Sequence, residues 1–462
     1  MATSPTSQPS AKSPLSSVLP PLIFGTATFN IQYNVDPYAL DTTGLVQEAL
    51  QLGIRAFDTS PYYGPAEELL GAALSTDIVR DHFPRNEYFL LTKVGRIASS
   101  EFDYSPQWVR KSIARSLQRL KTSYLDVVYC HDVEFVSEDK VVTAVKELRR
   151  IRDTEKSIKY IGISGYPLPV LCSVADRILR ETGEPLDAVM SYANYTLQNS
   201  LLASSGIDRL KAAGVDVVPN ASVLGMGLLR RDGIPENSAG DWHPSPAPLR
   251  AAIKRASDFC DRHGERLEVI AIRWSLESWL SVGSSVGSRG DPASGVPWVR
   301  ESNEQVGGSK LGVSVMGVSK KEELAKTMQV WRSILDGLED GKETARKAGR
   351  WERDHEWSLL RKRGVEILAE GVMEVLDEWC DETWGSPPRG FVNVRGLSAK
   401  EKEREKMASK VVEEEVDTCM LTPAASPEPT PIEAKPTSPD SKRLPDSRLA
   451  IRRGGAIPVP RA

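Results

Sequence analysis

Short apolar segments alternate with longer segments of helical periodicity over most of this 462-residue chain. From the second apolar segment to the seventh they recur about every 28 to 38 residues, the size of one β-α unit. Continuous runs of Val, Ile and Leu followed by helices are typical of parallel strands buried on both faces. Eight such runs predict a closed (β/α)8 barrel, or TIM barrel, and make a doubly wound sheet the less favoured arrangement. The predicted strands are PLIFGTA, GIRAFDTS, YFLLTKVG, LDVVYCHD, IKYIGISG, LDAVMSYA, VDVVPNAS and VSVMGVS.

The barrel is expected to cover residues 20–340. Within it, the Gly/Ser-rich segment 281–311 is predicted to be a flexible insertion, because its glycines do not follow a strand and open a helix. Residues 341–398 are predicted to form a helical extension whose tryptophans pack on the outside or the mouth of the barrel. Residues 1–19 and 399–462 are predicted to be disordered, since their polar composition cannot offset the entropy of ordering.

The composition limits the functions that need be considered. A content of 40% hydrophobic and 26% charged residues is that of a soluble globular protein. A formal net charge of −4 gives no general attraction to nucleic acid or to an anionic membrane, and no apolar run is long enough to cross a bilayer. The polar N-terminus does not resemble a secretory signal. Five well-separated cysteines, without a CxxC pair or metal-ligand spacing, favour a reducing cytoplasm and no metal site.

Polar residues follow five successive predicted strands at the ends that face the mouth of such a barrel. Each has an ordinary explanation when taken alone: Lys93 as a surface lysine, His131 as a core histidine, Asp58 as a helix N-cap. Their joint placement is harder to dismiss and favours a catalytic site. The residues are Asp58 and Tyr63 after the second predicted strand, then Lys93, His131, Ser164 and Ser191.

This set suits proton transfer at a carbonyl or alcohol. A neighbouring ammonium stabilises a phenolate, so Lys93 is expected to lower the pKa of Tyr63 from its ordinary value near 10. Asp58 would hold the lysine and offset its burial, and His131 would orient the substrate oxygen. No metal or disulfide motif supplies electrons, which leaves a nicotinamide cofactor as the hydride carrier.

Residues 20–336 resemble the aldo-keto reductase superfamily. The matching segments are FGTATF, FDTSPYYG, LLTKVG, LDVVYCHDVEF, IGISGYP and VLGMGLL. The resemblance implies a (β/α)8 barrel that binds NAD(P)(H) across its mouth and needs no metal. It implies Tyr63 as general acid/base, Lys93 and Asp58 as residues that tune it, and His131 as the residue that positions the substrate oxygen.

Several positions depart from the common reductase pattern. Ser164-Gly165 stands where a Ser-Asn pair usually holds the nicotinamide carboxamide, and Ser191 stands where a glutamine is usual. The segment after the seventh strand, Ala221–Leu224, lacks the aromatic residue that usually stacks on nicotinamide. These departures, together with HDVEFV, resemble a sugar-oxidising branch that contains fungal D-arabinose dehydrogenases and plant L-galactose dehydrogenases.

The last strand and its helix bear on the choice of cofactor. MGVSKKEELAKT resembles the superfamily's adenosine-phosphate site, and helix N-termini attract phosphate. Glu323 stands where NADP-specific members usually have an arginine, which favours NAD, although Lys320 and Lys321 keep NADP as the alternative. By resemblance, the residues expected to contact the cofactor are Gly25, Thr26, Asp58, Ser164, Ser191, Ser222, Leu224, Gly227, Ser319, Lys320 and Glu323.

The sequence therefore predicts an NAD-dependent aldose 1-dehydrogenase that forms an aldonolactone. D-arabinose is the expected sugar, which by the resemblance implies fungal erythroascorbate synthesis. A cytoplasmic protein is expected, as a monomer or weak homo-oligomer that binds neither nucleic acid nor membrane. Two alternatives stay open: an NADP-dependent reductase of aldehydes or ketones, and a non-catalytic nucleotide-binding regulatory subunit that captures a partner through the C-terminal extension.

Overall fold

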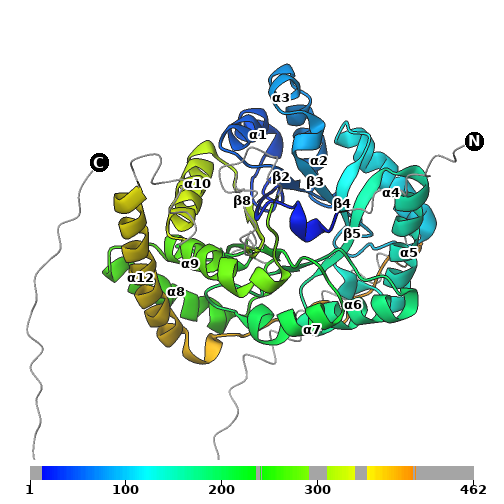
Figure 1. The fold of residues 1–462 in the computed structure, drawn as a ribbon. Helices are drawn as coiled ribbons and strands as arrows, with labels where there is room; N and C mark the ends of the chain where they lie inside the picture. Colours follow the sequence, from blue (N-terminus) through cyan, green and yellow to red (C-terminus); the bar gives the residue numbers. More distant parts are fainter. Residues whose placement is uncertain are drawn as a thin grey trace, which may run out of the picture. The chain divides into compact units, whose positions relative to one another are not determined.

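The computed structural model describes residues 13–235, 240, 242–290, 310–338, 351–398 and 401. Within them, eight parallel strands close into a barrel in chain order, with β8 pairing back onto β1 (Figure 1). This confirms the (β/α)8 prediction. The strands are β1 Leu22–Gly25, β2 Ala56–Asp58, β3 Phe89–Val94, β4 Leu125–His131, β5 Ile158–Gly165, β6 Ala188–Tyr192, β7 Asn220–Ala221 and β8 Ser314–Gly317.

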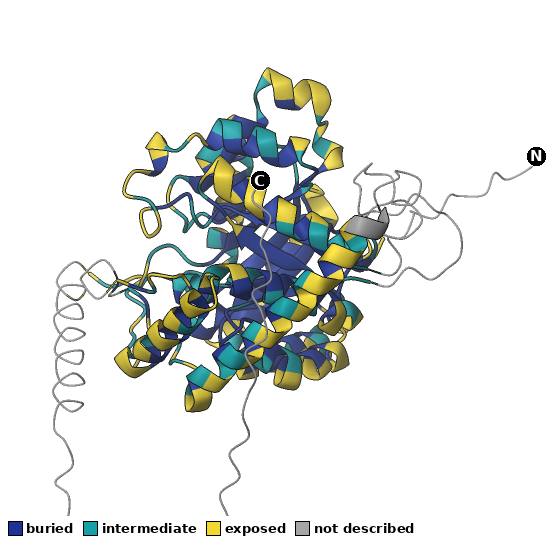
Figure 2. Ribbon diagram, turned by 90° about the vertical axis from the view of Figure 1, so that its left-hand side faces the viewer, coloured by how far each residue is buried: buried dark blue, intermediate teal, exposed yellow. Residues whose placement is uncertain are grey.

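Helices surround the strands, and their buried faces fill the layer between helix and barrel (Figure 2). Segments with apolar spacing near 3.6 form these helices because that spacing places the apolar residues on one side. The helices are α1 Thr42–Gln51, α2 Ala66–Leu74, α3 Asp77–His82, α4 Pro106–Arg119, α5 Glu138–Glu155, α6 Leu168–Thr182, α7 Ile207–Ala212, α8 Ala247–Arg262, α9 Leu267–Val282, α10 Lys321–Asp336 and α12 Trp351–Leu376.

Alternate residues of each strand point into the barrel, and this alternation delivers the site. The lower interior is apolar, with Ala56, Leu91 and Tyr129 in one buried cluster. Two residues further along the same strands come Asp58, Lys93 and His131, so the apolar interior gives way to polar groups at the mouth. The alternation along β2, β3 and β4 therefore brings all three side chains to the mouth of the barrel.

The N-terminal segment differs from its prediction. Residues 13–19, expected to be disordered, are ordered under the barrel: Leu15 and Leu19 are buried in the interior apolar cluster. Ser16 donates its N–H to Asp216 at 2.8 Å and accepts the N–H of Arg289 at 2.9 Å. The two leucines cover apolar area that the open end of the barrel would expose. Residues 1–12 lie outside the described residues.

The predicted insertion at 281–311 is also ordered at both ends. Ser288 pairs with Leu311, and the Ser288 hydroxyl donates to the Ser16 carbonyl at 3.0 Å. These contacts fix residues 281–290 and 310–311 against the N-terminal segment. The flexibility expected for residues 291–309 concerns a part of the chain that lies outside the described residues, as does the predicted tail from residue 402 onwards.

The C-terminal extension is helical only in part. α12 packs against α8, α9 and α10 on the outside of the barrel (Figure 1), with its Trp357 exposed. Residues 380–398, also included in the helical prediction, form no helix. They cross the loops at the mouth in an irregular segment, here called the C-terminal strap. Gln198 fixes its start through hydrogen bonds from its side-chain amide to the Trp379 and Glu382 carbonyls, at 2.8 and 3.1 Å.

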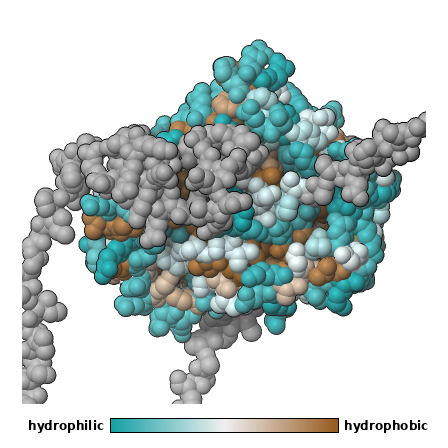
Figure 3. All heavy atoms as spheres, viewed as in Figure 1, coloured by the Kyte–Doolittle hydropathy of each residue, from teal (hydrophilic) through white to brown (hydrophobic). Residues whose placement is uncertain are grey.

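No helix among the described residues is long and apolar enough to cross a membrane. On the face shown in Figure 3, hydrophilic residues predominate and hydrophobic residues are grouped in small areas between them.

Candidate active site

A buried ion pair lies at the base of the mouth. The ammonium of Lys93 donates to Asp58 Oδ1 at 2.6 Å and to the Thr59 carbonyl at 2.9 Å. The side chains of Lys93 and Asp58 are only 2% and 5% exposed. Burial raises the pKa of Asp58, while the charge of Lys93 opposes that rise. Asp58 is therefore the partner of Lys93, and it does not cap α2, whose N-cap position is Pro65.

Tyr63 lies above this ion pair. A tight turn returns the chain over the end of β2, with the Tyr63 N–H donating to the Ser60 carbonyl at 3.0 Å. Gly64 adopts a φ of 58°, which glycine tolerates without strain, and α2 begins two residues later. The Lys93 ammonium lies 4.7 Å from the Tyr63 ring centroid. The turn thus places the acid and the phenol of FDTSPYYG on the same lysine, Lys93.

The expected lowering of the Tyr63 pKa is wrong for this structure. Burial, and then the charges of Asp58 and Asp132, raise the pKa of Tyr63 well above its ordinary value, and the charge of Arg96 opposes them. The positive charge of Lys93 is neutralised at short range by Asp58. The resting site therefore holds Tyr63 as a neutral phenol.

His131 stands at the end of β4 beside both tyrosines of the turn. Its ring lies 5.7 Å from that of Tyr63, at 90°, and 5.9 Å from that of Tyr62, at 74°. Burial lowers the pKa of His131 to about 3, with Lys93 and Arg96 adding to the effect and Asp132 opposing it. His131 is therefore neutral at physiological pH and can position a substrate oxygen by donating or accepting one hydrogen bond.

A second buried ion pair, not predicted from the sequence, adjoins His131. Arg96 binds Asp132, whose side chain is 3% exposed, and Asp132 Oδ2 lies 3.5 Å from His131 Nε2. Arg96 also donates to the Tyr62 hydroxyl at 3.1 Å and covers that ring with its guanidinium carbon 3.9 Å from the centroid. Arg96 comes three residues after Lys93, and Asp132 directly follows His131. Proximity to the tetrad, the set formed by Asp58, Tyr63, Lys93 and His131, was therefore the available signal.

Among the predicted cofactor residues, Ser164 has a buried hydroxyl that could bind a ligand. It lies near the end of β5, pairs in register with His131 of β4, and is 2% exposed. Its buried hydroxyl has no hydrogen-bond partner among the described residues. A buried hydroxyl without a partner fits a polar group of a bound molecule such as a carboxamide.

The remaining predicted cofactor residues follow the rim of the mouth. Ser191 Oγ already accepts a hydrogen bond from Asn194 at 2.9 Å, a residue the sequence analysis missed. Thr26 is tied to the end of β2, because its N–H and hydroxyl both reach the Asp58 carbonyl, at 2.8 and 3.0 Å. Gly25 ends β1, where an added Cβ would lie 3.0 Å from Val315. Ser222, Leu224 and Gly227 lie in the turn that follows β7.

The N-terminus of α10 carries the last three predicted cofactor residues. Lys320 is its N-cap residue, and the Ser319 N–H donates to the Glu323 carboxylate at 2.8 Å. Lys321 pairs with Asp41 at 2.8 Å and is thereby directed away from a second anion. A carboxylate therefore already occupies the backbone donor at this end of the helix.

Aromatic side chains from distant segments line the loops above the site. Trp384 of the C-terminal strap stacks on Tyr166 with centroids 4.7 Å apart and planes at 2°, and its edge meets His243 at 5.3 Å. Trp242 lies next to His243 at 5.4 Å and contacts Tyr33 at 5.7 Å, so these rings form one continuous group. Such surfaces suit the apolar C–H faces of a sugar ring.

Ser386 of the strap contacts the loop after β4. Its hydroxyl donates to Glu134 at 3.0 Å, and the Tyr166 N–H donates to the same carboxyl oxygen at 3.2 Å. Burial and the charge of Asp132 raise the pKa of Glu134 to about 8. The second Glu134 oxygen is close to Gly165, where an added Cβ would lie only 2.5 Å away. Glycine at position 165 therefore makes room for Glu134.

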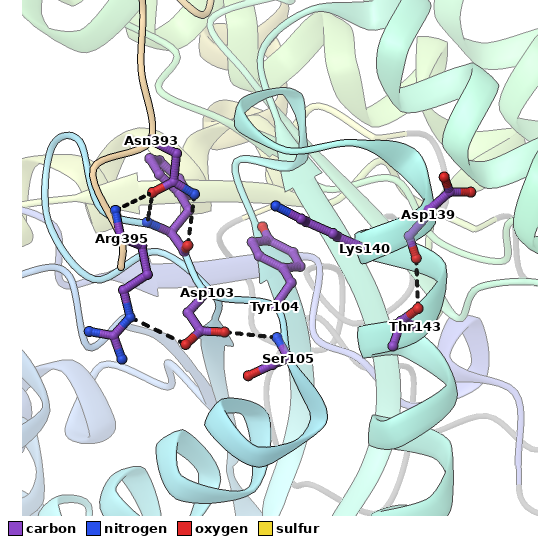
Figure 4. Close-up of a pocket in the computed structure, with 9 residues that line it drawn as sticks. Asp103, Tyr104, Ser105, Asp139, Lys140, Thr143, Asn393 and Arg395 are labelled. Carbon is purple, nitrogen blue, oxygen red and sulfur yellow. Dashed lines mark hydrogen bonds and ion pairs between the residues drawn. The ribbon is translucent and has the colours of Figure 1, made fainter. Parts of the chain in front are cut away.

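Further along the strap, its residues complete a cavity of about 320 Å³ beside the mouth (Figure 4). Arg395 pairs with Asp103 at 3.3 Å, and Asn393 exchanges two hydrogen bonds with the Phe102 backbone, at 3.0 and 2.8 Å. Lys140 extends from α5 towards Tyr104 in this view. The charged groups at this cavity are largely paired, so the tetrad remains the better candidate for the chemistry.

The chain resembles several characterised enzymes. Residues 21–337 match the Aldo/keto reductase family. D-arabinose 1-dehydrogenase of Saccharomyces cerevisiae is 41% identical over 268 residues, which are 58% of this chain and 78% of the yeast protein. L-galactose dehydrogenase of Arabidopsis thaliana is 39% identical over 51% of this chain and 70% of the plant protein. D-threo-aldose 1-dehydrogenase of a Pseudomonas species is 28% identical over 51% of this chain and 75% of the bacterial protein.

Proposed function

Because this chain belongs to the aldo/keto reductase family, whose members are oxidoreductases with nicotinamide cofactors, we propose that it is an NAD-dependent aldose 1-dehydrogenase. It oxidises C1 of a cyclic aldose to the aldonolactone, and D-arabinose is its preferred sugar. The observation that carries the proposal is the buried Asp58–Lys93 pair beneath Tyr63, with neutral His131 beside it. The identity to two enzymes named for aldose oxidation supports the substrate class.

In the proposed reaction, the C1–H bond of the sugar breaks with transfer of hydride, and the O1–H proton passes to the Tyr63 oxygen as the C1=O bond forms. His131 donates a hydrogen bond to O1, and Asp58 holds the Lys93 ammonium beneath the phenol, 4.7 Å from its ring centroid. Oxidised nicotinamide, when bound, would supply the hydride acceptor, and its positive ring would favour loss of the Tyr63 proton to solvent, which leaves the phenolate that takes the O1 proton. The unpartnered Ser164 hydroxyl fits its carboxamide.

Arg96 and Asp132 support a sugar as substrate. Asp132 lies beside His131 and pairs with Arg96, and the Arg96 guanidinium lies over the ring of Tyr62. Charged groups and an apolar ring therefore lie next to each other at this part of the mouth. A polyol presents hydroxyl groups and C–H faces in the same alternation. An aldonolactone product would be consumed in erythroascorbate synthesis. The buried free cysteines, such as Cys130 and Cys172, accord with a cytoplasmic protein.

A panel of aldoses with NAD and with NADP tests the proposal. The expected result is the highest kcat/KM for D-arabinose with NAD and formation of a lactone, measured by NADH absorbance and product analysis. Faster reduction of a simple aldehyde with NADPH would instead assign the chain to the reductases. Tight binding of NAD without turnover of any sugar or aldehyde would assign it a regulatory role.

The preference for NAD is proposed to depend on Glu323. Its carboxylate accepts the Ser319 N–H at 2.8 Å, so the 2′-phosphate of NADP would have to displace a negative charge from a helix N-terminus. Glu323→Ala is expected to improve kcat/KM for NADP by roughly tenfold, because removing a nearby like charge is worth about 1 kcal/mol or more. NAD kinetics should change less.

Glu322→Ala is the matched control. It removes the same charge from the same helical turn, where Glu322 makes no contact with Ser319. Equal gains in kcat/KM for NADP in both variants would show that the total negative charge of this helical turn, and not the position of Glu323, sets the cofactor preference. No gain with Glu323→Ala would place the adenosine end of the cofactor elsewhere.

A further inference from the structure

Ser60 joins the turn that carries Tyr63 to the imidazole of His131. It lies two residues after β2 and is fully buried. Its Oγ accepts the N–H of Tyr62 at 3.1 Å and lies 3.1 Å from Nδ1 of His131. Within the described part of the chain, that ring nitrogen is the only acceptor in contact with the Ser60 hydroxyl. The geometry therefore lets Ser60 donate its proton to Nδ1.

On the opposite edge of the imidazole ring, Nε2 lies near the carboxylate of Asp132. Asp132 Oδ2 lies 3.5 Å from Nε2 of His131. Burial opposes the charge of Asp132, but the paired guanidinium of Arg96 lowers its pKa, so it stays ionised and can only accept hydrogen bonds. At 3.5 Å Asp132 makes no hydrogen bond to Nε2, but its negative charge and the donor at Nδ1 both favour the neutral ring with its proton on Nε2, where that N–H stays available to a substrate oxygen.

We propose that Ser60 is a positioning residue that, with Asp132, holds His131 as the Nε2–H tautomer. The inference rests on the proposed function, in which His131 donates to O1 of the sugar. The other tautomer would present a lone pair to that oxygen and repel it. Ser60 thus couples two catalytic residues, since the same hydroxyl accepts an N–H from the turn of Tyr63 and donates to His131.

Nitrogen-15 NMR of histidine-labelled protein tests the tautomer without any substrate. The chain has five histidines, and a His131→Asn variant identifies the signals of His131. The wild type is expected to show one protonated ring nitrogen, Nε2, whose signals stay constant between about pH 6 and 9 because the ring remains neutral. In Ser60→Ala the Nδ1 signal should shift and the second tautomer should become populated.

Kinetics provide the second measurement. Ser60→Ala is expected to lower kcat for the sugar by about ten- to a hundredfold, within the usual contribution of a positioned proton donor. The affinity for NAD, followed by quenching of protein fluorescence, should remain unchanged. Ser60→Thr keeps the hydroxyl and should restore both the NMR signals and most of kcat. Circular dichroism verifies that each variant is folded.

Two results would overturn the inference. A wild-type His131 protonated on Nδ1 contradicts it directly. Unchanged His131 signals in folded Ser60→Ala, whatever the activity, would leave Ser60 only the structural task of accepting the Tyr62 N–H. If instead the wild type fails to oxidise any aldose but shows the Nε2–H tautomer, the proposed function fails and the assignment of the tautomer stands.

Discussion

Tyr63→Phe is expected to reduce kcat for aldose oxidation by about a thousandfold or more, while NAD affinity stays close to that of the wild type. The phenol is the group placed to take the O1 proton, and general acid/base catalysis contributes typically about a hundred- to ten-thousandfold. The ring itself packs at 90° to His131 and above Lys93, and phenylalanine preserves both contacts. Steady-state kinetics and a fluorescence titration with NAD measure the two quantities.

Tyr62→Phe is the matched control, because it removes a phenol from the adjacent position. Its hydroxyl accepts a hydrogen bond from Arg96 at 3.1 Å, outside the Asp58–Lys93 pair. We expect a loss of less than about tenfold, consistent with one hydrogen bond to a charged donor. The proposed mechanism fails if Tyr63→Phe keeps most of its turnover or if the two variants are equally impaired.

Lys93→Met is expected to abolish measurable turnover and to lower the free energy of unfolding by about 3 to 5 kcal/mol. Removing one partner of a buried ion pair leaves the other charge uncompensated. Asp58 is only 3% exposed and its pKa is already raised by burial, so it would either carry its charge without a partner or take up a proton, and one of its oxygens already lacks a partner among the described residues. Urea denaturation followed by circular dichroism measures the stability, and NADH formation measures turnover.

The double variant Asp58→Asn/Lys93→Met separates stability from catalysis. With both charges removed, most of the lost stability should return, because replacing both members of a buried pair is often close to neutral. Turnover should not return, since the Lys93 ammonium beneath Tyr63 is gone. A double variant that regains activity, or a Lys93→Met protein as stable as the wild type, would contradict the role given to this pair.

The barrel and its tetrad could be predicted from sequence because they depend on local patterns. A period of two along each strand places Asp58 after Ala56 and Lys93 after Leu91, and this pattern is visible in the chain itself. The contacts at the two chain ends depend on distant residues. Leu15 is ordered only because it covers the open end of a barrel formed by later residues.

The ionisation of Tyr63 could not be predicted from the same residues. An adjacent lysine suggested a lowered pKa, but the actual direction follows from burial and from the sum of nearby charges. Asp132 contributes to that sum and lies one residue beyond His131, in a left-handed conformation with a φ of 55°. Ser60 was equally inconspicuous, since a serine two residues after a strand gives no indication of the imidazole 71 positions away that it contacts.

The C-terminal strap imposes an order of events on protein synthesis. Trp384, Ser386 and Phe391 leave the ribosome after all eight strands have been made, yet they pack on loops that follow β3, β4 and β5. Phe391 lies 4.8 Å from Phe135 and 5.9 Å from Phe102, so these two stacked rings lack part of their cover on a nascent barrel. During synthesis the barrel can therefore close before the strap residues that complete the walls of its mouth have been made.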